Sequence, residues 1–277
     1  MSNTFAQLGL PKSLTDTLDR LGFVEPFPVQ GATIPDVLAG HDVSGRAPTG
    51  SGKTLAFGLP LLARVGKSQG RHPRAMVVVP TRELAEQIKQ ELVPFAKAMD
   101  RKVFAIYGGV AYGGQKSALR QGVDVLIATP GRLEDLIEQR SVDLSQVEIA
   151  VLDEADRMAD MGFMPAVRRI LDATSNSRQT LLFSATLDGD VAVLSREYQT
   201  KPRMHEAGAI GTAMPDAEHH FWSVEHQDRP SRTADVVEAM GSTIVFTRTR
   251  HGADRLARQL SKLGVQAVAM HGGRNQN

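Results

Sequence analysis

The feature that most constrains the fold is a regular alternation of short apolar runs with longer segments of helical spacing. Five runs rich in Val, Ile, Leu and Ala have the character of buried strands: residues 75–79, 103–107, 123–128, 147–152 and 180–183. Between them, the clearest helix is predicted at 83–99, where apolar residues recur every three or four positions. Strands that alternate with helices predict right-handed β–α–β units, and therefore an α/β fold whose parallel sheet is covered on both faces.

A polar or glycine-rich cluster follows each predicted strand. The clusters lie at 80–85, 108–109, 129–132, 153–156 and 184–186. Parallel strands end at the same edge of a sheet, and ligands of such folds bind in the crevice outside those ends. We therefore expect the five clusters to meet at one edge, whereas ordinary surface residues would be scattered over both edges.

A change of pattern after Tyr198 predicts a second domain. Residues 205–216 contain Gly, Ala and Pro with little periodicity, which indicates a linker after a first domain at 1–204. A second alternation then begins, with strands expected at 220–224, 243–247 and 265–271 and helices at 229–240 and 253–263. Three strands are few for a doubly covered parallel sheet, so residues 217–277 are expected to form part of a second α/β domain.

Residues 47–54, Ala-Pro-Thr-Gly-Ser-Gly-Lys-Thr, predict a phosphate-binding loop before a helix. A glycine-rich turn points backbone N–H groups at phosphate oxygens, and the helix N-terminus adds a positive end. Lys53 would then approach the β- and γ-phosphates, and Thr54 would offer Mg²⁺ a hydroxyl ligand. The general pattern has Gly where this chain has Ala47, and a chance glycine-rich turn is the alternative. The candidate nucleotide contacts are Ala47, Thr49, Gly50, Ser51, Gly52, Lys53 and Thr54.

Residues 153–156, Asp-Glu-Ala-Asp, form an acidic cluster at the end of a predicted strand. Asp153 fits the carboxylate that holds Mg²⁺ in enzymes with a phosphate loop. Glu154 beside it would orient or deprotonate an attacking water. Acidic residues also favour the first turn of a helix, and that alternative can hold at the same time. The combination with the phosphate loop favours nucleotide hydrolysis, with Lys53, Asp153 and Glu154 as the catalytic candidates.

These motifs together resemble the DEAD-box ATP-dependent RNA helicase family. Residues 153–156 spell the motif that names the family, and Ala47 is the family's own variant of the phosphate loop. Further stretches resemble the Q motif at 22–30, motif Ia at 80–85, the GG motif at 108–109, motif Ib at 129–132, motif III at 184–186 and motif IV at 244–246. Pro48 and Phe27 depart from the residues usual in the family. The resemblance covers essentially the whole chain and implies two RecA-like domains, the second one partial.

The resemblance implies ATP and Mg²⁺ as cofactors, with an adenine contact upstream of the phosphate loop. The amide of Gln30 has both a donor and an acceptor for the adenine edge. Phe23 is the candidate to stack on the base, and packing in the core is its alternative. Thr54 and Asp153 are the implied magnesium ligands.

RNA is the implied partner, and three further residues are implied to couple the RNA site to the nucleotide site. The implied RNA contacts are Thr81, Arg82, Gly109, Thr129 and Arg132. Hydroxyls, backbone N–H groups and guanidinium suit phosphates and carry no base readout, so binding is expected to be indifferent to sequence. The coupling residues are Asp156, Ser184 and Thr186, the last two of which could instead be helix N-caps.

Composition limits the alternatives. A net charge of +1 means that a polyanion must be held by local donors and not by a global positive field. The chain has no cysteine, which excludes disulfides and thiolate metal sites and fits a cytoplasmic protein. The longest apolar run, near 55–65, is too short to span a membrane. The expected function is ATP-dependent unwinding of short RNA duplexes. The alternative is a chain that binds nucleotide and RNA without turnover, because the family's later motifs are not among these residues.

Overall fold

The computed structural model describes residues 4–48, 50–206 and 218–271. Contacts between Cα atoms divide the chain into two compact units, Met1–Thr212 and Ala213–Asn277. The first unit holds the sheet and all the predicted site residues. No helix among the described residues has the length and apolar character needed to cross a membrane.

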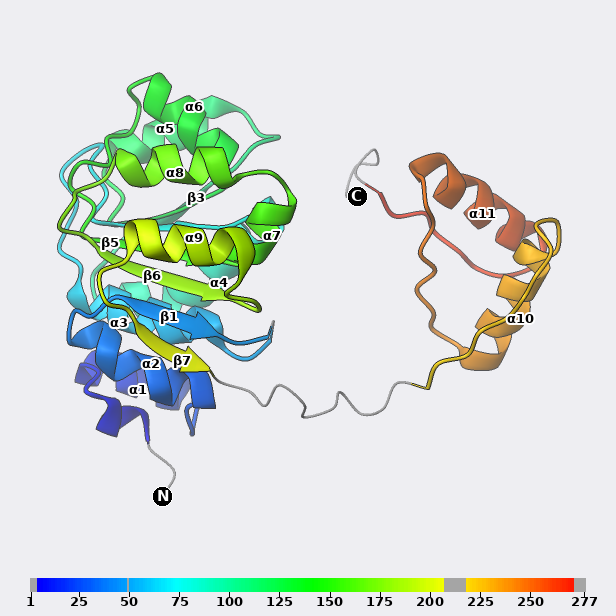
Figure 1. Cartoon of the computed structure of the whole chain (residues 1–277), viewed down its shortest axis with the longest axis horizontal. Coiled ribbons are helices and arrows are strands. Elements are labelled where there is room, and N and C mark those ends of the chain that lie inside the picture. Colours follow the sequence, from blue (N-terminus) through cyan, green and yellow to red (C-terminus); the bar gives the residue numbers. More distant parts are fainter. Residues whose placement is uncertain (1–3, 49, 207–217, 272–277) are drawn as a thin grey trace. The chain divides into compact units, whose positions relative to one another are not determined.

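The first unit is built on a parallel seven-stranded sheet with the spatial order β3-β4-β2-β5-β6-β1-β7 (Figure 1). The strands are β1 Val43–Arg46, β2 Ala75–Val78, β3 Val103–Ile106, β4 Val125–Ala128, β5 Ile149–Asp153, β6 Gln179–Ser184 and β7 Arg203–Glu206. The five strands expected from apolar runs are all present, within three residues at each end. The prediction of an α/β fold with a parallel sheet is confirmed.

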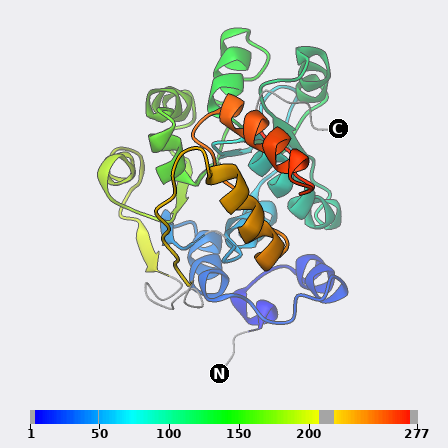
Figure 2. The ribbon, with the colours of Figure 1, turned by 90° about the vertical axis from the view of Figure 1, so that its right-hand side faces the viewer.

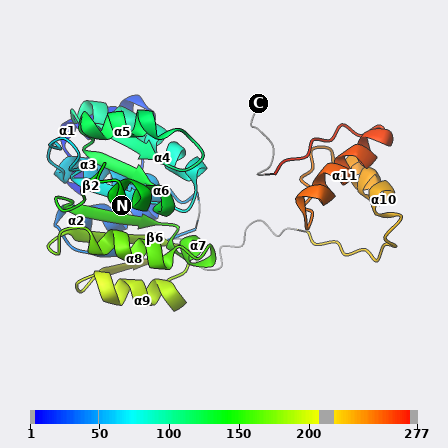
Figure 3. The same ribbon diagram turned by 90° about the horizontal axis from the view of Figure 1, so that it is seen from above.

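Helices cover both faces of this sheet (Figures 1 and 3). They are the 3-10 helix η1 Phe5–Leu8 and the α-helices α1 Lys12–Arg20, α2 Pro28–Leu38, α3 Lys53–Arg64, α4 Arg82–Ala98, α5 Tyr112–Arg120, α6 Pro130–Glu138, α7 Ala155–Asp160, α8 Met164–Asp172 and α9 Gly189–Tyr198. Because neighbouring residues of a strand point to opposite faces, Val77 packs in one core with α2–α4, whereas Met76 and Val78 pack in a second core with α5–α9. A sheet buried on both faces explains why its strands are apolar without alternation.

Strands β1 and β7 were not predicted, because neither carries an apolar run. In β1, a Cβ atom added at Gly45 would lie 2.6 Å from Cε1 of Phe183 on β6, so the Phe183 ring leaves no room for a side chain at this position. Strand β7 is an edge strand of mostly exposed residues, paired only to β1. It runs to Glu206, so the sheet continues two residues into the segment predicted as a linker.

The second unit contains helices α10 Arg229–Met240 and α11 Arg250–Lys262, which pack against each other (Figure 2). Both lie close to their predicted positions. The strands expected at 220–224, 243–247 and 265–271 are wrong for this structure, since the described residues 218–271 contain no strand. Alternating apolar residues specify a strand only where a neighbour pairs with its backbone, and here Phe221 and Phe246 are each 92% exposed.

Candidate nucleotide and RNA site

The candidate residues of the first unit gather at the carboxyl ends of the strands, in two adjacent groups. Strands β1, β6 and β5 are consecutive in the sheet and are followed by the phosphate loop, by Ser184 at the end of β6 and by Glu154 after Asp153. Strands β2, β4 and β3 form the other half and are followed by Thr81, Thr129 and Gly109. The expectation that these clusters share one edge is confirmed, and the strand order separates nucleotide candidates from RNA candidates.

The phosphate loop is closed by its own side chains. Lys53, the first residue of α3, is buried, and its Nζ donates to the carbonyl oxygen of Ala47 at 3.0 Å. Ser51 Oγ donates to the carbonyl of Pro48 at 2.7 Å. These donors are thus held inside the turn, where the phosphates of a nucleotide would be placed. Thr49, also predicted as a contact, lies outside the described residues.

Gln30 ties helix α2 to the phosphate loop. Its Nε2 donates to the carbonyl of Gly52 at 3.0 Å, and its Oε1 accepts from the backbone N–H of Phe27 at 2.8 Å. An amide has a second N–H and further lone pairs, so these bonds do not exhaust its capacity for an adenine edge. The structure therefore places Gln30 at the loop, and its contact with adenine stays a prediction.

The aromatic side chain at the loop is Phe27 and not Phe23. Phe23 packs against the first core, with its ring centroid 6.4 Å from that of Phe95. Phe27 is 53% exposed and lies against Gly52. The geometry favours core packing for Phe23 and makes Phe27, which in the sequence is only a departure from the family pattern, the candidate to stack on the base. Its position three residues before Gln30, at the start of α2, was the available signal.

Replacing Gly52 by Ala is expected to weaken nucleotide binding much more than replacing Gly50 by Ala. Both glycines have left-handed φ angles, 85° and 83°, which cost a residue with a side chain about 1–2 kcal/mol. Only at Gly52 would the new Cβ clash, 2.5 Å from Gln30 Nε2 and 2.6 Å from Phe27 Cδ2, whereas nothing lies within 4 Å at Gly50. Titration with a fluorescent ATP analogue checks this, and equal losses in both variants would contradict it.

Asp153, the last residue of β5, is a buried carboxylate. It is 3% exposed, and Oδ1 accepts from the backbone N–H of Glu154 at 3.1 Å. The pKa of Asp153 is raised from 3.8 to about 6, chiefly by burial and to a smaller extent by the charges of Glu154 and Asp156, while the charge of Lys53 and the bond from the Glu154 N–H oppose the rise. A buried anion in this state gains most from a neighbouring cation.

The residues present fit a magnesium ion. The part of the chain that the structure describes contains no group of three or more His, Asp or Glu side chains that could hold a metal ion. Mg²⁺ typically takes one or two protein ligands together with substrate phosphates and waters, which suits Asp153 and the Thr54 hydroxyl. The pKa of Glu91 on α4 is raised by burial, and a hydrogen bond with Thr54 offsets part of that rise. Sequence reasoning missed Glu91, because nothing marks one acidic residue within a helix.

Glu154 is the N-cap of α7 and adopts a left-handed conformation, with φ 53° and ψ 49°. Its Oε2 lies 3.2 Å from Nη1 of Arg157, one helical turn later. A side chain other than Gly rarely adopts this conformation, and such residues cluster at functional sites. The backbone therefore turns at Glu154, between the end of β5 at Asp153 and the start of α7.

Asp156 is hydrogen-bonded to the residues that follow β6. Its backbone N–H donates to Ser184 Oγ at 3.2 Å, and its Oδ2 accepts from the backbone N–H of Thr186 at 3.2 Å and from the Thr186 hydroxyl at 3.5 Å. The next helix has Asp188 as its N-cap, so neither Ser184 nor Thr186 caps it. The geometry favours the contact with Asp156 that the family resemblance implies.

The RNA candidates differ in how they present their donors. Thr81 caps helix α4, since its Oγ1 accepts from the backbone N–H of Leu84 at 3.2 Å, and Arg82 beside it is half-exposed and paired with Glu83. Thr129 precedes Pro130 at the start of α6. Arg132 differs from the others, because its side chain is buried and its Nη2 donates to the carbonyl of Val110 at 3.0 Å.

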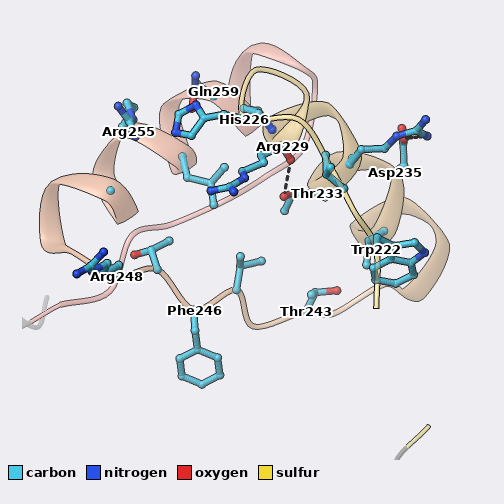
Figure 4. Close-up of a pocket in the computed structure, with 18 of the residues that line it drawn as sticks. Trp222, His226, Arg229, Thr233, Asp235, Thr243, Phe246, Arg248, Arg255 and Gln259 are labelled. Atoms are coloured by element: carbon cyan, nitrogen blue, oxygen red, sulfur yellow. Dashed lines mark hydrogen bonds and ion pairs between the residues drawn. The ribbon is translucent and has the colours of Figure 1, made fainter. Parts of the chain in front are cut away.

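A separate hollow of ≈ 1210 Å³ lies within the second unit (Figure 4). It is bounded by α10, α11 and the extended segments around Trp222 and Phe246. The Phe246 ring points away from it, and Arg248 and Arg255 stand along its rim (Figure 4). None of the predicted site residues lines this hollow.

The chain resembles known helicases along almost its whole length. A family model described as DEAD/DEAH box helicase matches residues 27–194. The ATP-dependent RNA helicase DeaD of Escherichia coli K12 is 38% identical over 276 residues, covering 99% of this chain and 44% of that protein. The pre-mRNA-splicing ATP-dependent RNA helicase prp28 of Neosartorya fischeri is 37% identical over 306 residues, covering 99% of this chain and 38% of that protein. The chain spans about two fifths of the length of these curated relatives.

A solved structure shares the fold. The DEAD box protein from the hyperthermophile Methanococcus jannaschii superposes with a TM-score of 0.70 at 30% identity, covering 100% of this chain and 75% of that chain. The predicted RecA-like character of the parallel sheet is confirmed by this match.

Proposed function

Because the chain belongs to the DEAD/DEAH box helicase family, we propose that it is an ATP-dependent RNA helicase motor, which couples ATP binding and hydrolysis to RNA binding and the separation of short duplexes. The observation that carries the proposal is the division of one sheet edge. The phosphate loop, Asp153 and Ser184 follow three consecutive strands, and the candidate RNA residues follow the next three. A nucleotide and an RNA strand would therefore bind beside each other at one edge of the sheet.

In the nucleotide half, Lys53 and the N-terminus of α3 bind the phosphates of ATP. Thr54 and Asp153 would hold Mg²⁺, which when bound neutralises charge on the phosphate oxygens. Glu154 orients the attacking water and accepts its proton. Gln30 reaches the adenine from beside the loop, and Phe27 is placed to cover the base.

In the RNA half, Thr81, Arg82, Gly109 and Thr129 contact the phosphate backbone. Two hydroxyls, a backbone N–H and an exposed guanidinium offer no pattern that distinguishes one base from another. Binding is therefore indifferent to sequence, with affinity that falls as salt rises.

Asp156 joins the ends of two neighbouring strands, β5 and β6, within the nucleotide half. It follows Glu154 in the nucleotide half, and its bonds to Ser184 and Thr186 join the acidic cluster to the end of β6. A movement of the acidic cluster on ATP binding would therefore be passed to the loop after β6 through three hydrogen bonds.

The test is ATP turnover by the 277-residue chain with and without single-stranded RNA, beside Lys53→Ala. We expect RNA to stimulate turnover, and Lys53→Ala to lower that turnover roughly 10²-fold or more, since it removes a charge that stabilises the phosphates in the transition state. Nucleotide binding without turnover would favour a chain that only binds its ligands. Turnover that does not respond to RNA would favour an ATPase of another kind.

A further inference from the structure

Arg132 is poorly placed to bind a phosphate directly. The residue is 7% exposed, and its Nη2 is taken by the carbonyl of Val110 at 3.0 Å. Its Nε and Nη1 are fully buried and have no hydrogen-bond partner among the described residues. Nitrogens without exposed surface cannot meet a phosphate oxygen unless the surrounding loop moves. The guanidinium of Arg132 therefore contacts the protein itself and not a ligand at the surface.

Tyr112 covers the guanidinium of Arg132. The Cζ atom of Arg132 lies 4.0 Å from the centroid of the Tyr112 ring, within the range of a cation–π contact. The Tyr112 hydroxyl donates to Oδ2 of Asp135 at 2.8 Å, so the ring is anchored to α6 at its far end. Lys116 Nζ lies 5.7 Å from the same ring. Tyr112 thus contacts two residues of α6: its hydroxyl donates to Asp135, and its ring covers the guanidinium of Arg132.

Both residues act on the loop between β3 and α5. Arg132 fixes the carbonyl of Val110, and Tyr112 is the first residue of α5, directly after that loop. Gly109, the candidate RNA contact, precedes Val110 and lies beside Arg82: a Cβ atom added at Gly109 would be 3.6 Å from Arg82 Nη1. Arg132 and Tyr112 therefore hold the backbone conformation of the loop at Gly109. The exposed charged side chain beside Gly109 is that of Arg82.

We propose that Arg132 and Tyr112 are positioning residues, which hold the loop at 108–111 in the shape that binds RNA while Arg82 provides the phosphate contact. The inference rests on the RNA site proposed above. It assigns a role to Tyr112, and it changes that of Arg132 from a phosphate ligand to an internal support.

Salt dependence separates the two roles. For single strands, each neutralised phosphate adds about 0.7 to the slope of log affinity against log salt concentration. Fluorescence anisotropy of a labelled U-rich oligonucleotide with the whole chain, at a series of KCl concentrations, measures that slope. We expect Arg132→Gln and Tyr112→Ala to weaken binding roughly tenfold with the slope unchanged, because no phosphate contact is lost. Arg82→Gln, the matched control, should weaken binding and lower the slope by about 0.7.

Two conservative variants sharpen the test. Arg132→Lys keeps the charge but loses the planar fork, so it should lose affinity as Arg132→Gln does. Tyr112→Phe keeps the ring over Arg132 and should retain most of the affinity. ATP-analogue binding, at the far half of the edge, confirms that each variant is folded.

The proposal is overturned if Arg132→Gln lowers the slope by about 0.7, as a direct phosphate ligand would, or if Tyr112→Ala binds RNA as tightly as the parent chain. A parent chain that shows no salt-dependent RNA binding would instead overturn the proposed RNA site, and this inference with it.

Discussion

Replacing Glu154 by Gln is expected to lower RNA-stimulated ATP turnover by about 10²- to 10⁴-fold, the usual contribution of a general base, while ATP affinity stays nearly unchanged. Gln has the same size and chain length, so the left-handed turn at the start of α7 and the neighbouring Asp153 are preserved. What is lost is the ability to accept a proton from the attacking water. Turnover and nucleotide affinity, measured on the same preparation, separate loss of the base from loss of the site.

Arg157→Gln is the control for this prediction. Arg157 pairs with Glu154 and is more than half exposed, so its loss frees the carboxylate without removing it. Exposed ion pairs contribute little, and turnover should change only slightly. Turnover by Glu154→Gln close to that of the parent chain would reject the assignment of Glu154 as the base, whatever the result with Arg157→Gln.

The sequence predicted those strands that carry their own apolar residues. Strands β2, β4 and β5 are buried on both faces, so composition alone identifies them. Strand β1 is defined by what surrounds it, because Phe183 fills the space that a larger residue than Gly45 would need. The opposite error arose at 243–247, where an apolar run forms no strand because backbone pairing depends on a neighbour and not on the run itself.

The position of the site was predictable, and the direction of individual side chains was not. A cluster that directly follows a strand of a parallel sheet must lie at the carboxyl edge, which is why the order of the sequence was enough to put Asp153 and Thr129 at that edge. Whether a ring or a guanidinium then points to the surface depends on its packing partners. The Phe23 ring packs against Phe95 in the core, and the Arg132 guanidinium packs against the Tyr112 ring.

Replacing Asp153 by Asn is expected to stabilise the chain when nucleotide and magnesium are absent. The pKa of Asp153 rises from 3.8 to about 6 in the fold, chiefly through burial. Since each pKa unit is worth about 1.4 kcal/mol, ionised Asp153 lowers the free energy of unfolding by about 3 kcal/mol. Asn is nearly isosteric and carries no charge, so it avoids this cost. If Asp153 holds magnesium as proposed, its carboxylate binds that ligand at the expense of the stability of the fold, as functional sites often do.

The dependence on pH gives the sign of this effect. Because the folded pKa lies above the unfolded one, the stability of the parent chain at this residue is fully present below pH 3.8 and is lost as the pH rises to about 6. In EDTA buffer, urea unfolding should therefore give Asp153→Asn a free energy of unfolding above that of the parent chain by about 1 kcal/mol at pH 4.5 and by about 3 kcal/mol at pH 7.5. Asp160→Asn, an exposed change on α7, should shift stability by less than about 0.5 kcal/mol at either pH. A lower stability of Asp153→Asn at pH 7.5 would mean that Lys53 already compensates the buried charge, and that the carboxylate has no need of a metal ion.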